Sequence, residues 1–138
     1  MKKIGYILIL AFLFVSCDKV LEEVSFQATL DEGNVYETGE EIRFNFAGNP
    51  DYITFYSGER GCKYEYAGQL DEEGTANFGI AVKSMSAREE SFVHTYTEAG
   101  EYEAVFVAKN ITFEGCNEVT VRLKVSIAEA AGDSGDED

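Results

Sequence analysis

The sequence predicts an all-β sandwich of seven to eight strands that follows a cleaved signal peptide. Apolar and polar side chains alternate in residues 42–46 and again in residues 119–127, which is the period of a half-buried strand. Turn residues separate such runs at intervals of roughly 8–12 residues, a spacing typical of sandwiches. After residue 16 no helical period of useful length appears, so an α/β fold or a helix bundle has almost no support.

Four strands are expected in the first half of the chain. The first places its apolar side chains on one face, and the second and third are joined by the turn Ala47-Gly48-Asn49-Pro50-Asp51. The fourth is short and places Tyr64 and Tyr66 together on one face. These strands cover residues 24–30, 42–46, 52–56 and 63–66.

Four more strands are expected over residues 78–82, 91–96, 101–109 and 119–127. The third of these is almost continuously apolar or aromatic, which is typical of a central strand that is buried on both faces. Residues 110–117 are expected to form a loop that holds Cys116. From residue 128 to the end, glycine, serine and acids predict a disordered tail, so the domain is expected to span residues 24–127.

The N-terminal segment has the composition of an export signal. Lys2 and Lys3 precede an apolar run over residues 4–15, which is too short for a bilayer because a spanning helix needs roughly 20 residues. The segment 14–17, read Phe-Val-Ser-Cys, resembles the lipobox of bacterial lipoproteins. That resemblance implies a cut after residue 16, acylation of Cys17 and a tether over residues 17–23. The alternative is a plain signal peptide with an ordinary thiol at Cys17.

The charge of the chain argues against nucleic acid as a partner. Removing residues 1–16 takes away two lysines and no acid, so the formal net charge of −15 becomes −17. Such a surface repels phosphate backbones. About 122 residues then remain, which suits a single domain.

Two further cysteines, Cys62 and Cys116, form an even count in an exported chain. A disulfide between them would close a loop of 54 positions and stabilise the fold by roughly 4 kcal/mol. The alternative is two separate thiols. Spacing alone leaves both open, because it does not place the two Cα atoms within bonding distance.

A family resemblance appears in residues 93–110. His94 and Tyr96 form a His-x-Tyr strand, Gly100 and Tyr102 follow as a Gly-x-Tyr turn, and an apolar strand ends near Asn110. This pattern resembles the core signature of polycystic-kidney-disease (PKD) repeats. Residues 46–59 are similar to a family of uncharacterised bacterial lipoproteins. The resemblance implies a PKD-like, immunoglobulin-type sandwich of the kind that accompanies glycan-uptake systems, and a structural role for His94.

No catalytic or metal constellation stands out. His94 is the only histidine, and no nearby nucleophile or zinc-ligand spacing accompanies it. With 26 acids in the chain, any pair of carboxylates is an unspecific sign of a glycosidase. We therefore expect no enzymatic activity, no cofactor and no metal.

The tyrosines carry the binding hypothesis. Tyr52 and Tyr56 have the parity opposite to Ile53 and Phe55, so they are expected to face outward. Sugar rings pack on aromatic planes, and nearby polar side chains fix their orientation. The candidate site comprises Tyr52, Tyr56, Tyr64, Tyr66, Glu59 and Arg60. Simple packing of the tyrosines at the rim of the core is the alternative.

The sequence thus predicts a lipid-anchored, non-catalytic binding module of the cell envelope, an outer-membrane lipoprotein in which Cys17 carries the anchor. Its candidate partner is a polysaccharide. The alternative is a spacer or protein-interaction domain that has an envelope protein as its partner and no small ligand. The residues do not decide between surface exposure and a periplasmic orientation.

Overall fold

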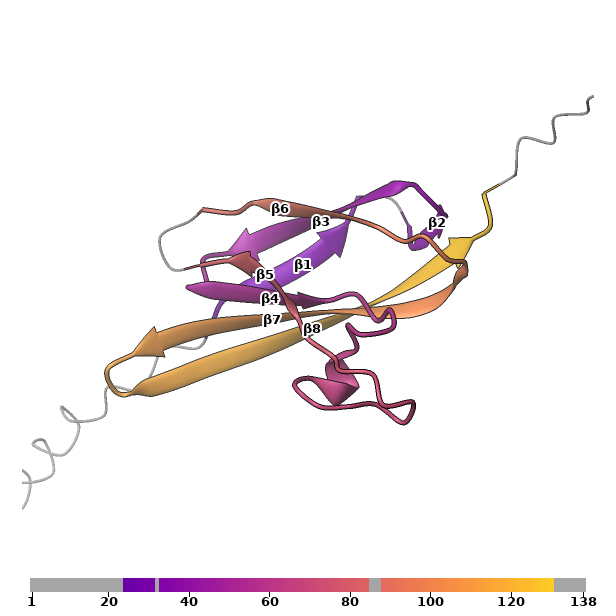
Figure 1. Ribbon diagram of the computed structural model, residues 1–138. Helices are drawn as coiled ribbons and strands as arrows, with labels where there is room; N and C mark the ends of the chain where they lie inside the picture. The colour runs from indigo at the N-terminus through magenta and orange to yellow at the C-terminus, as the bar shows by residue number, and fades with distance from the viewer. Residues whose placement is uncertain (1–23, 32, 85–87, 131–138) are drawn as a thin grey trace, which may run out of the picture.

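The computed structural model describes residues 24–31, 33–84 and 88–130. These residues form eight strands in two β-sheets that pack face to face (Figure 1). One short 3-10 turn lies outside the sheets. The predicted all-β sandwich is confirmed. The expected signal peptide, the acylated Cys17 and its tether lie outside the described residues, as do residues 131–138 of the expected tail. The tail was expected to begin at Ala128, but that residue is the last of a strand over Gly115–Ala128.

The smaller sheet is antiparallel and has the strand order β1-β3-β6. Its central strand alternates as expected, because Ile42 and Phe44 are fully buried while Arg43 is exposed. Phe44 lies opposite Leu30 on one side and Phe92 on the other. The three strands are β1 (Phe26–Leu30), β3 (Glu41–Gly48) and β6 (Ser91–Thr95).

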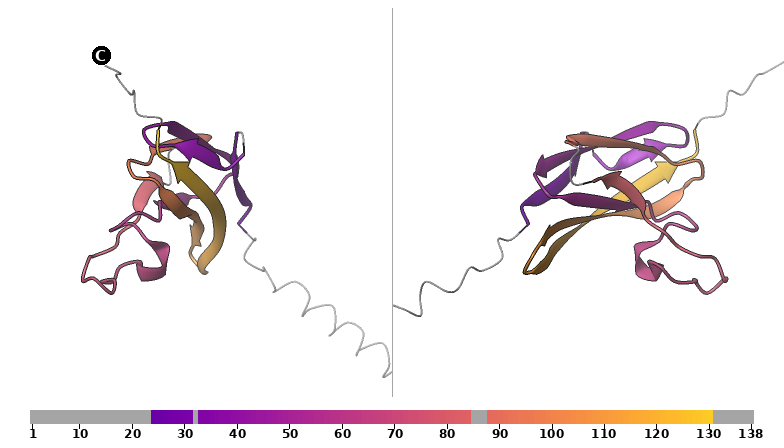
Figure 2. Two further views of the ribbon diagram at one scale, coloured as in Figure 1. Left: turned by 90° about the vertical axis from the view of Figure 1, so that its right-hand side faces the viewer. Right: turned by 60° about the vertical axis from the view of Figure 1, so that its left-hand side comes forward.

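The larger sheet has the strand order β2-β8-β7-β4-β5. Its centre is the long antiparallel ladder of β7 and β8, and the short β2 joins the edge as a parallel strand. The views in Figure 2 show this sheet beneath the smaller one. Its strands are β2 (Val35–Glu37), β4 (Tyr52–Tyr56), β5 (Ile80–Lys83), β7 (Gly100–Thr112) and β8 (Gly115–Ala128).

The core between the sheets is aromatic. Phe106 of β7 stacks on Phe55 of β4 with ring centroids 4.8 Å apart. Phe44 of β3 meets the Phe106 ring edge-on, with centroids 5.0 Å apart. Every residue from Ala104 to Ala108 is buried, as expected for a central strand. These contacts join the two sheets into a single core.

Residues 63–66 do not form the expected strand. The pairing of β4 with β7 ends at Tyr56, and Gly58 then turns the chain away with φ +88°. Tyr64–Tyr66 instead form the 3-10 turn η1, so Tyr64 and Tyr66 do not share a sheet face. An isolated alternation of three residues was too short a signal to predict a strand.

The expected loop over residues 110–117 was also wrong. β7 and β8 continue their ladder through Asn110↔Asn117 and Ile111↔Cys116 to Thr112↔Gly115. The hairpin therefore turns at Phe113 and Glu114. Residues 110–117 lack a clear alternation, and local composition does not distinguish the exposed end of a ribbon from a loop.

Of the two alternatives left open for the cysteines, the structure shows separate thiols, because Cys62 and Cys116 are both free. The Sγ atom of Cys62 lies 3.9 Å from the carbonyl oxygen of Phe55, whose register partner is Phe106. Cys116 pairs with Ile111, five residues further along β7, or roughly 16 Å at the rise of a strand. The two Cα atoms of a disulfide must lie within about 7 Å.

Candidate functional site

The most elaborate part of the surface is the segment that connects β4 to β5, residues 57–79, which we call the β4–β5 segment. It contains η1 and projects from the sandwich at one end of β4 (Figure 2). Two side chains hold its beginning: His94 of β6, in the smaller sheet, and Tyr96, which directly follows that strand. The hydroxyl of Tyr96 donates to the carbonyl oxygen of Ser57 at 2.7 Å, and Nε2 of His94 lies 2.6 Å from Oε1 of Glu59.

Both contacts are shielded from water. Tyr96 and Ser57 are almost completely buried, and the side chains of His94 and Glu59 are 17% and 28% exposed. Burial raises the pKa of Tyr96 far above its ordinary value, and the Glu59 carboxylate adds to the effect. The tyrosine therefore stays a neutral donor. The structural role expected for His94 is consistent with this position.

Hydrogen bonds organise the far end of the segment. The buried Asn77 accepts from the backbone N–H of Lys63 at 3.1 Å and donates to the carbonyl oxygen of Thr75 at 2.8 Å. Oδ1 of Asp71 accepts from the backbone N–H groups of Glu73 and Thr75 at 2.9 and 2.8 Å. These donors, first of all Thr75, lower the pKa of Asp71. The segment is thus internally ordered.

A close backbone approach sets the segment against the larger sheet. A Cβ atom on Gly58 would lie 2.8 Å from the carbonyl oxygen of Glu103 on β7, and φ at Gly58 is +88°. Both features require glycine. The segment therefore crosses β7 at this point, next to the outer face of the sheet.

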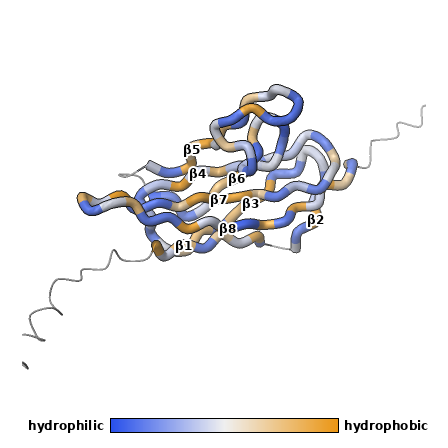
Figure 3. Tube along the Cα trace, turned by 90° about the horizontal axis from the view of Figure 1, so that it is seen from below, coloured by the Kyte–Doolittle hydropathy of each residue, from blue (hydrophilic) through white to orange (hydrophobic). Residues whose placement is uncertain are grey.

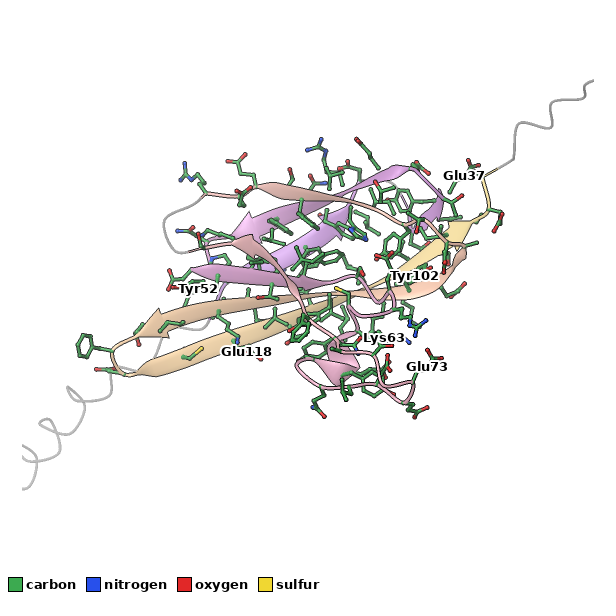
Figure 4. The ribbon with its side chains drawn as sticks, in the orientation of Figure 1. Glu37, Tyr52, Lys63, Glu73, Tyr102 and Glu118 are labelled. Carbon is green, nitrogen blue, oxygen red and sulfur yellow. The ribbon has the colours of Figure 1, made fainter. Side chains whose placement is uncertain are left out.

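A shallow groove runs along this crossing, and we call it the β4–β5 groove. It consists of two adjoining hollows of about 460 and 500 Å³ that share Gly58, Lys63, Glu101 and Tyr102. Figure 4 labels Lys63 and Glu73 on the segment and Tyr102 on β7, all at the same end of the molecule. The remaining lining residues are Glu59, Arg60, Tyr64, Glu65, Asp71, Glu73, Thr97, Glu98, Glu103, Val105 and Arg122.

An aromatic residue stands at the centre of the first hollow. The guanidinium carbon of Arg122 lies 4.9 Å from the centre of the Tyr64 ring, a cation–π distance. Tyr56 meets the same ring edge-on at 5.3 Å, and Nη1 of Arg122 lies 2.5 Å from Oε1 of Glu103. The Tyr64 ring is thus held in place from two sides while it still lines the groove.

Apart from Val105, the other side chains of the groove are polar, and they carry both charges. Tyr102 packs on Tyr96 at 4.5 Å and donates its hydroxyl proton to the carbonyl oxygen of Glu98 at 2.8 Å. Its pKa is raised, mainly because of burial and then through Glu59. Within the described ranges, the ammonium group of Lys63 forms no ion pair. An aromatic plane among carboxylates and cations can bind a neutral molecule rich in hydroxyl groups.

Three of the six predicted ligand-binding residues meet at this groove. Tyr64 lines one hollow, and Glu59 and Arg60 line the other. Glu59 is engaged by His94, and Arg60 lies 3.7 Å from Glu73. The structure thus brings three of the six residues to one groove.

The other three lie elsewhere. Tyr52 and Tyr56 do face outward, opposite the buried Ile53 and Phe55. The Tyr56 ring packs against Gly79 and Tyr64, so it supports the groove and does not line it.

Tyr52 is four residues away on β4, about 13 Å, toward the opposite end of the sheet (Figure 4). Tyr66 lines neither hollow. The expected shared face of Tyr64 and Tyr66 is absent, because η1 is a 3-10 turn and not a strand.

Sequence reasoning missed most of the opposite wall of the groove. Glu101, Tyr102, Glu103 and Arg122 line that wall, and Lys63, which was also missed, lies on the segment that faces it. Register decides their position: Val105 pairs with Arg122, and Tyr56 with Val105. The Gly-x-Tyr turn at Tyr102 was the one sequence signal for any of these residues, and it indicated the fold and not a binding site.

Two observations complete the description of residues 24–31, 33–84 and 88–130. In these ranges no group of three or more His, Cys, Asp or Glu side chains is placed to hold a metal ion. No helix there is long and apolar enough to cross a membrane.

A family comparison covers nearly the whole chain. Residues 16–136 match the profile of a family described as a domain of unknown function, DUF5017. The chain belongs to the DUF5017 family. No curated protein matches the sequence. The DUF5017 match includes both sheets and every residue of the β4–β5 groove, so it confirms the expectation of an uncharacterised family.

Proposed function

We propose that this DUF5017 protein is a lipid-anchored protein of the bacterial envelope that binds glycans without catalysis, through the β4–β5 groove. The observation that carries the proposal is the Tyr64 ring, which Arg122 and Tyr56 hold in place within an open, polar groove. Sugars present both a C–H face for an aromatic plane and hydroxyl groups for charged side chains.

The anchor and the location are parts of the same proposal. The lipobox-like segment 14–17 supports acylation of Cys17 at the outer membrane, and the tether would leave the sandwich free of the bilayer. The His94, Tyr96 and Tyr102 pattern supports a PKD-like, immunoglobulin-type class for the sandwich, because these residues order the beginning of the groove. Incorporation of labelled palmitate that disappears with Cys17→Ser tests the anchor.

The test of binding is a glycan array probed with the mature chain and with two matched variants. Tyr64→Ala removes the aromatic plane of the groove, whereas Tyr66→Ala removes a tyrosine of the same 3-10 turn that lines neither hollow. Truncating an aromatic anchor commonly costs more than about 1 kcal/mol, so we expect affinity to fall about tenfold for Tyr64→Ala. Affinity should stay unchanged for Tyr66→Ala.

Two results would refute this assignment. Equal losses in both variants would show that the groove is not the site. If the wild-type chain bound no plant, host or microbial glycan on the array, the proposal of glycan binding would be refuted.

A protein-interaction or spacer role is the second candidate. The observation that favours it is the exposed apolar side chains beside β5, an edge strand of the larger sheet. Phe78 and Ile80 are 66% and 40% exposed there. An edge strand with apolar neighbours can pair with an extended segment of another protein. Crosslinking on intact cells that captures one partner through this edge, with no glycan bound, would favour this role.

A further inference from the structure

The end of the β7–β8 hairpin extends beyond the rest of the sandwich. The last pair between β4 and β7 is Tyr52↔Lys109, and beyond it β7 pairs with β8 alone. We call residues 110–117 the hairpin tip. Figure 1 shows it projecting past the ends of the other strands.

The hairpin tip is apolar at its extremity. Phe113 is 110% exposed and Ile111 is 48% exposed, and Figure 3 shows hydrophobic residues at this end. Glu114 is the one charged residue among residues 110–117. At the base, Nζ of Lys109 lies 3.5 Å from Oε2 of Glu118, so these two charges offset each other. A fully exposed phenyl ring at the end of a rigid ribbon is suited to contact an apolar phase.

The first described strand begins at the same end of the molecule. Phe26, the first residue of β1, pairs with Gly48, which precedes the turn that contains Asp51. The backbone N–H of Asp51 donates to Oδ1 of Asn110 at 2.8 Å, and Ile111 donates back to Oδ2 of Asp51 at 3.1 Å. The start of β1 and the base of the hairpin tip therefore lie at the same end of the sandwich, on either side of the turn that contains Asp51.

We infer that the hairpin tip enters the interfacial layer of a lipid membrane, with Phe113 and Ile111 as the inserting side chains. The inference rests on the proposed anchor at Cys17. Six residues, 18–23, lie between that cysteine and the described part of the chain, so about seven Cα–Cα steps reach at most about 25 Å. Such a short tether holds this end of the sandwich next to the membrane surface.

The dimensions and charges of the hairpin tip are suited to contact with a lipid membrane. Phe113 lies four residues beyond Lys109, or about 13 Å, so its ring reaches the lipid boundary while the acidic sandwich stays in water. The formal charge of −17 for the chain without residues 1–16 disfavours anionic lipid, so the tip is suited to a zwitterionic surface. A tether raises the effective concentration of the tip to the millimolar range, and a weak insertion then suffices.

Insertion would orient the glycan groove. β4 runs from Tyr52, near the hairpin tip, toward Tyr56 and Gly58, where the groove begins. With the tip in the membrane, the strands stand away from the surface and the groove lies on the far half of the domain. Insertion of the hairpin tip therefore orients the domain, whereas the acyl anchor keeps the domain at the membrane.

The test uses the absence of tryptophan from the chain, because any introduced tryptophan is a unique fluorescent reporter. Phe113→Trp places it at the tip, and Val35→Trp places it on β2, a 68% exposed position that pairs with Ser126 at the opposite end. The mature chain carries a histidine tag in place of Cys17 and binds phosphatidylcholine vesicles that contain a nickel-chelating lipid. This tether makes the test independent of acylation.

We expect the F113W reporter to shift its emission to the blue on the vesicles and to be quenched by a lipid-attached quencher at least about threefold more than the V35W reporter. Equal, weak quenching of both reporters on vesicle-bound protein would overturn the inference. A blue shift of F113W on cell envelopes but not on lipid vesicles would also overturn it, in favour of a protein partner. Palmitate labelling of Cys17 and glycan binding are measured separately. A failure of the proposed function is therefore distinguishable from a failure of the hairpin tip to insert into the membrane.

Discussion

Tyr96 illustrates how one buried polar atom places a surface feature. Its side chain is fully buried, and its ring lies against His94 at 4.7 Å and against Tyr102 at 4.5 Å. Its hydroxyl would be unsatisfied without the carbonyl oxygen of Ser57. The hydrogen bond therefore fixes the first residue of the β4–β5 segment, and with it one end of the groove.

Replacing Tyr96 with phenylalanine tests this role. The change keeps the ring but leaves the carbonyl oxygen of the buried Ser57 without this donor. We expect the free energy of unfolding to fall by about 1–3 kcal/mol, the usual penalty for a buried unpaired polar group. Urea denaturation measures the change. Tyr66→Phe, which alters an exposed hydroxyl, is the control, and equal stability of the two variants would contradict the assigned role.

At the scale of elements, the β4–β5 segment is held by hydrogen bonds far more than by apolar contacts. η1 has no buried residue, and the exposed Leu70 is linked to Ala76 by a single bridge. Asn77 and Asp71 supply the side-chain contacts that close its turns. Such a segment opens locally at lower free energy than the core strands do.

Acid should therefore loosen the turn at Asp71 before it affects the core. Hydrogen bonds lower the pKa of Asp71 in the folded state below its ordinary value of 3.8. The unfolded turn then takes up the proton first as the pH falls. The stabilisation is accordingly complete above the ordinary pKa and is lost as the pH falls through the folded pKa.

Amide exchange measured by NMR reports this directly. We expect the N–H groups of Glu73 and Thr75 to be protected at neutral pH and to lose protection below about pH 4, after correction for intrinsic exchange. Asp71→Asn should show low, pH-independent protection. Glu72→Gln removes the same charge from the same turn and serves as the control. Wild-type protection that persists through the acid range would contradict the role of the carboxylate.

At the scale of the whole molecule, one aromatic cluster joins all the layers. Phe106 contacts Phe44, Phe46 and Phe55 at centroid distances between 4.8 and 5.3 Å, and Phe26 at 6.5 Å. These rings come from β1, β3, β4 and β7, and thus from both sheets. The cluster makes the two sheets one cooperative unit, because neither sheet alone shields its apolar inner face from water.

Phe106→Ala should destabilise the whole domain. We expect a loss of about 3–5 kcal/mol in the free energy of unfolding, since the change removes a buried ring and leaves a cavity. Phe113→Ala makes the identical chemical change at a fully exposed position and should shift stability by less than about 0.5 kcal/mol. Urea denaturation of both variants gives the comparison. A similar effect at the two positions would contradict this account of the core.

The sequence by itself determined the class of the fold and most of the strands. Alternation in residues 42–46 and 119–127 specified which faces are buried, because side chains on a strand point to opposite sides in turn. The central position of β7 also followed from its composition. These properties are local, so a short window of residues contains them.

Tertiary structure alone decided the groove, the free cysteines and the shape of the hairpin. Tyr64 meets Arg122 58 positions later, and Glu59 meets His94 35 positions later. Those distances depend on sheet register and on the turn at Gly58, where a missing Cβ lets two backbones touch. The same register keeps Cys62 and Cys116 apart. Periodicity shows which side chains point outward, whereas register and backbone turns determine which of them meet.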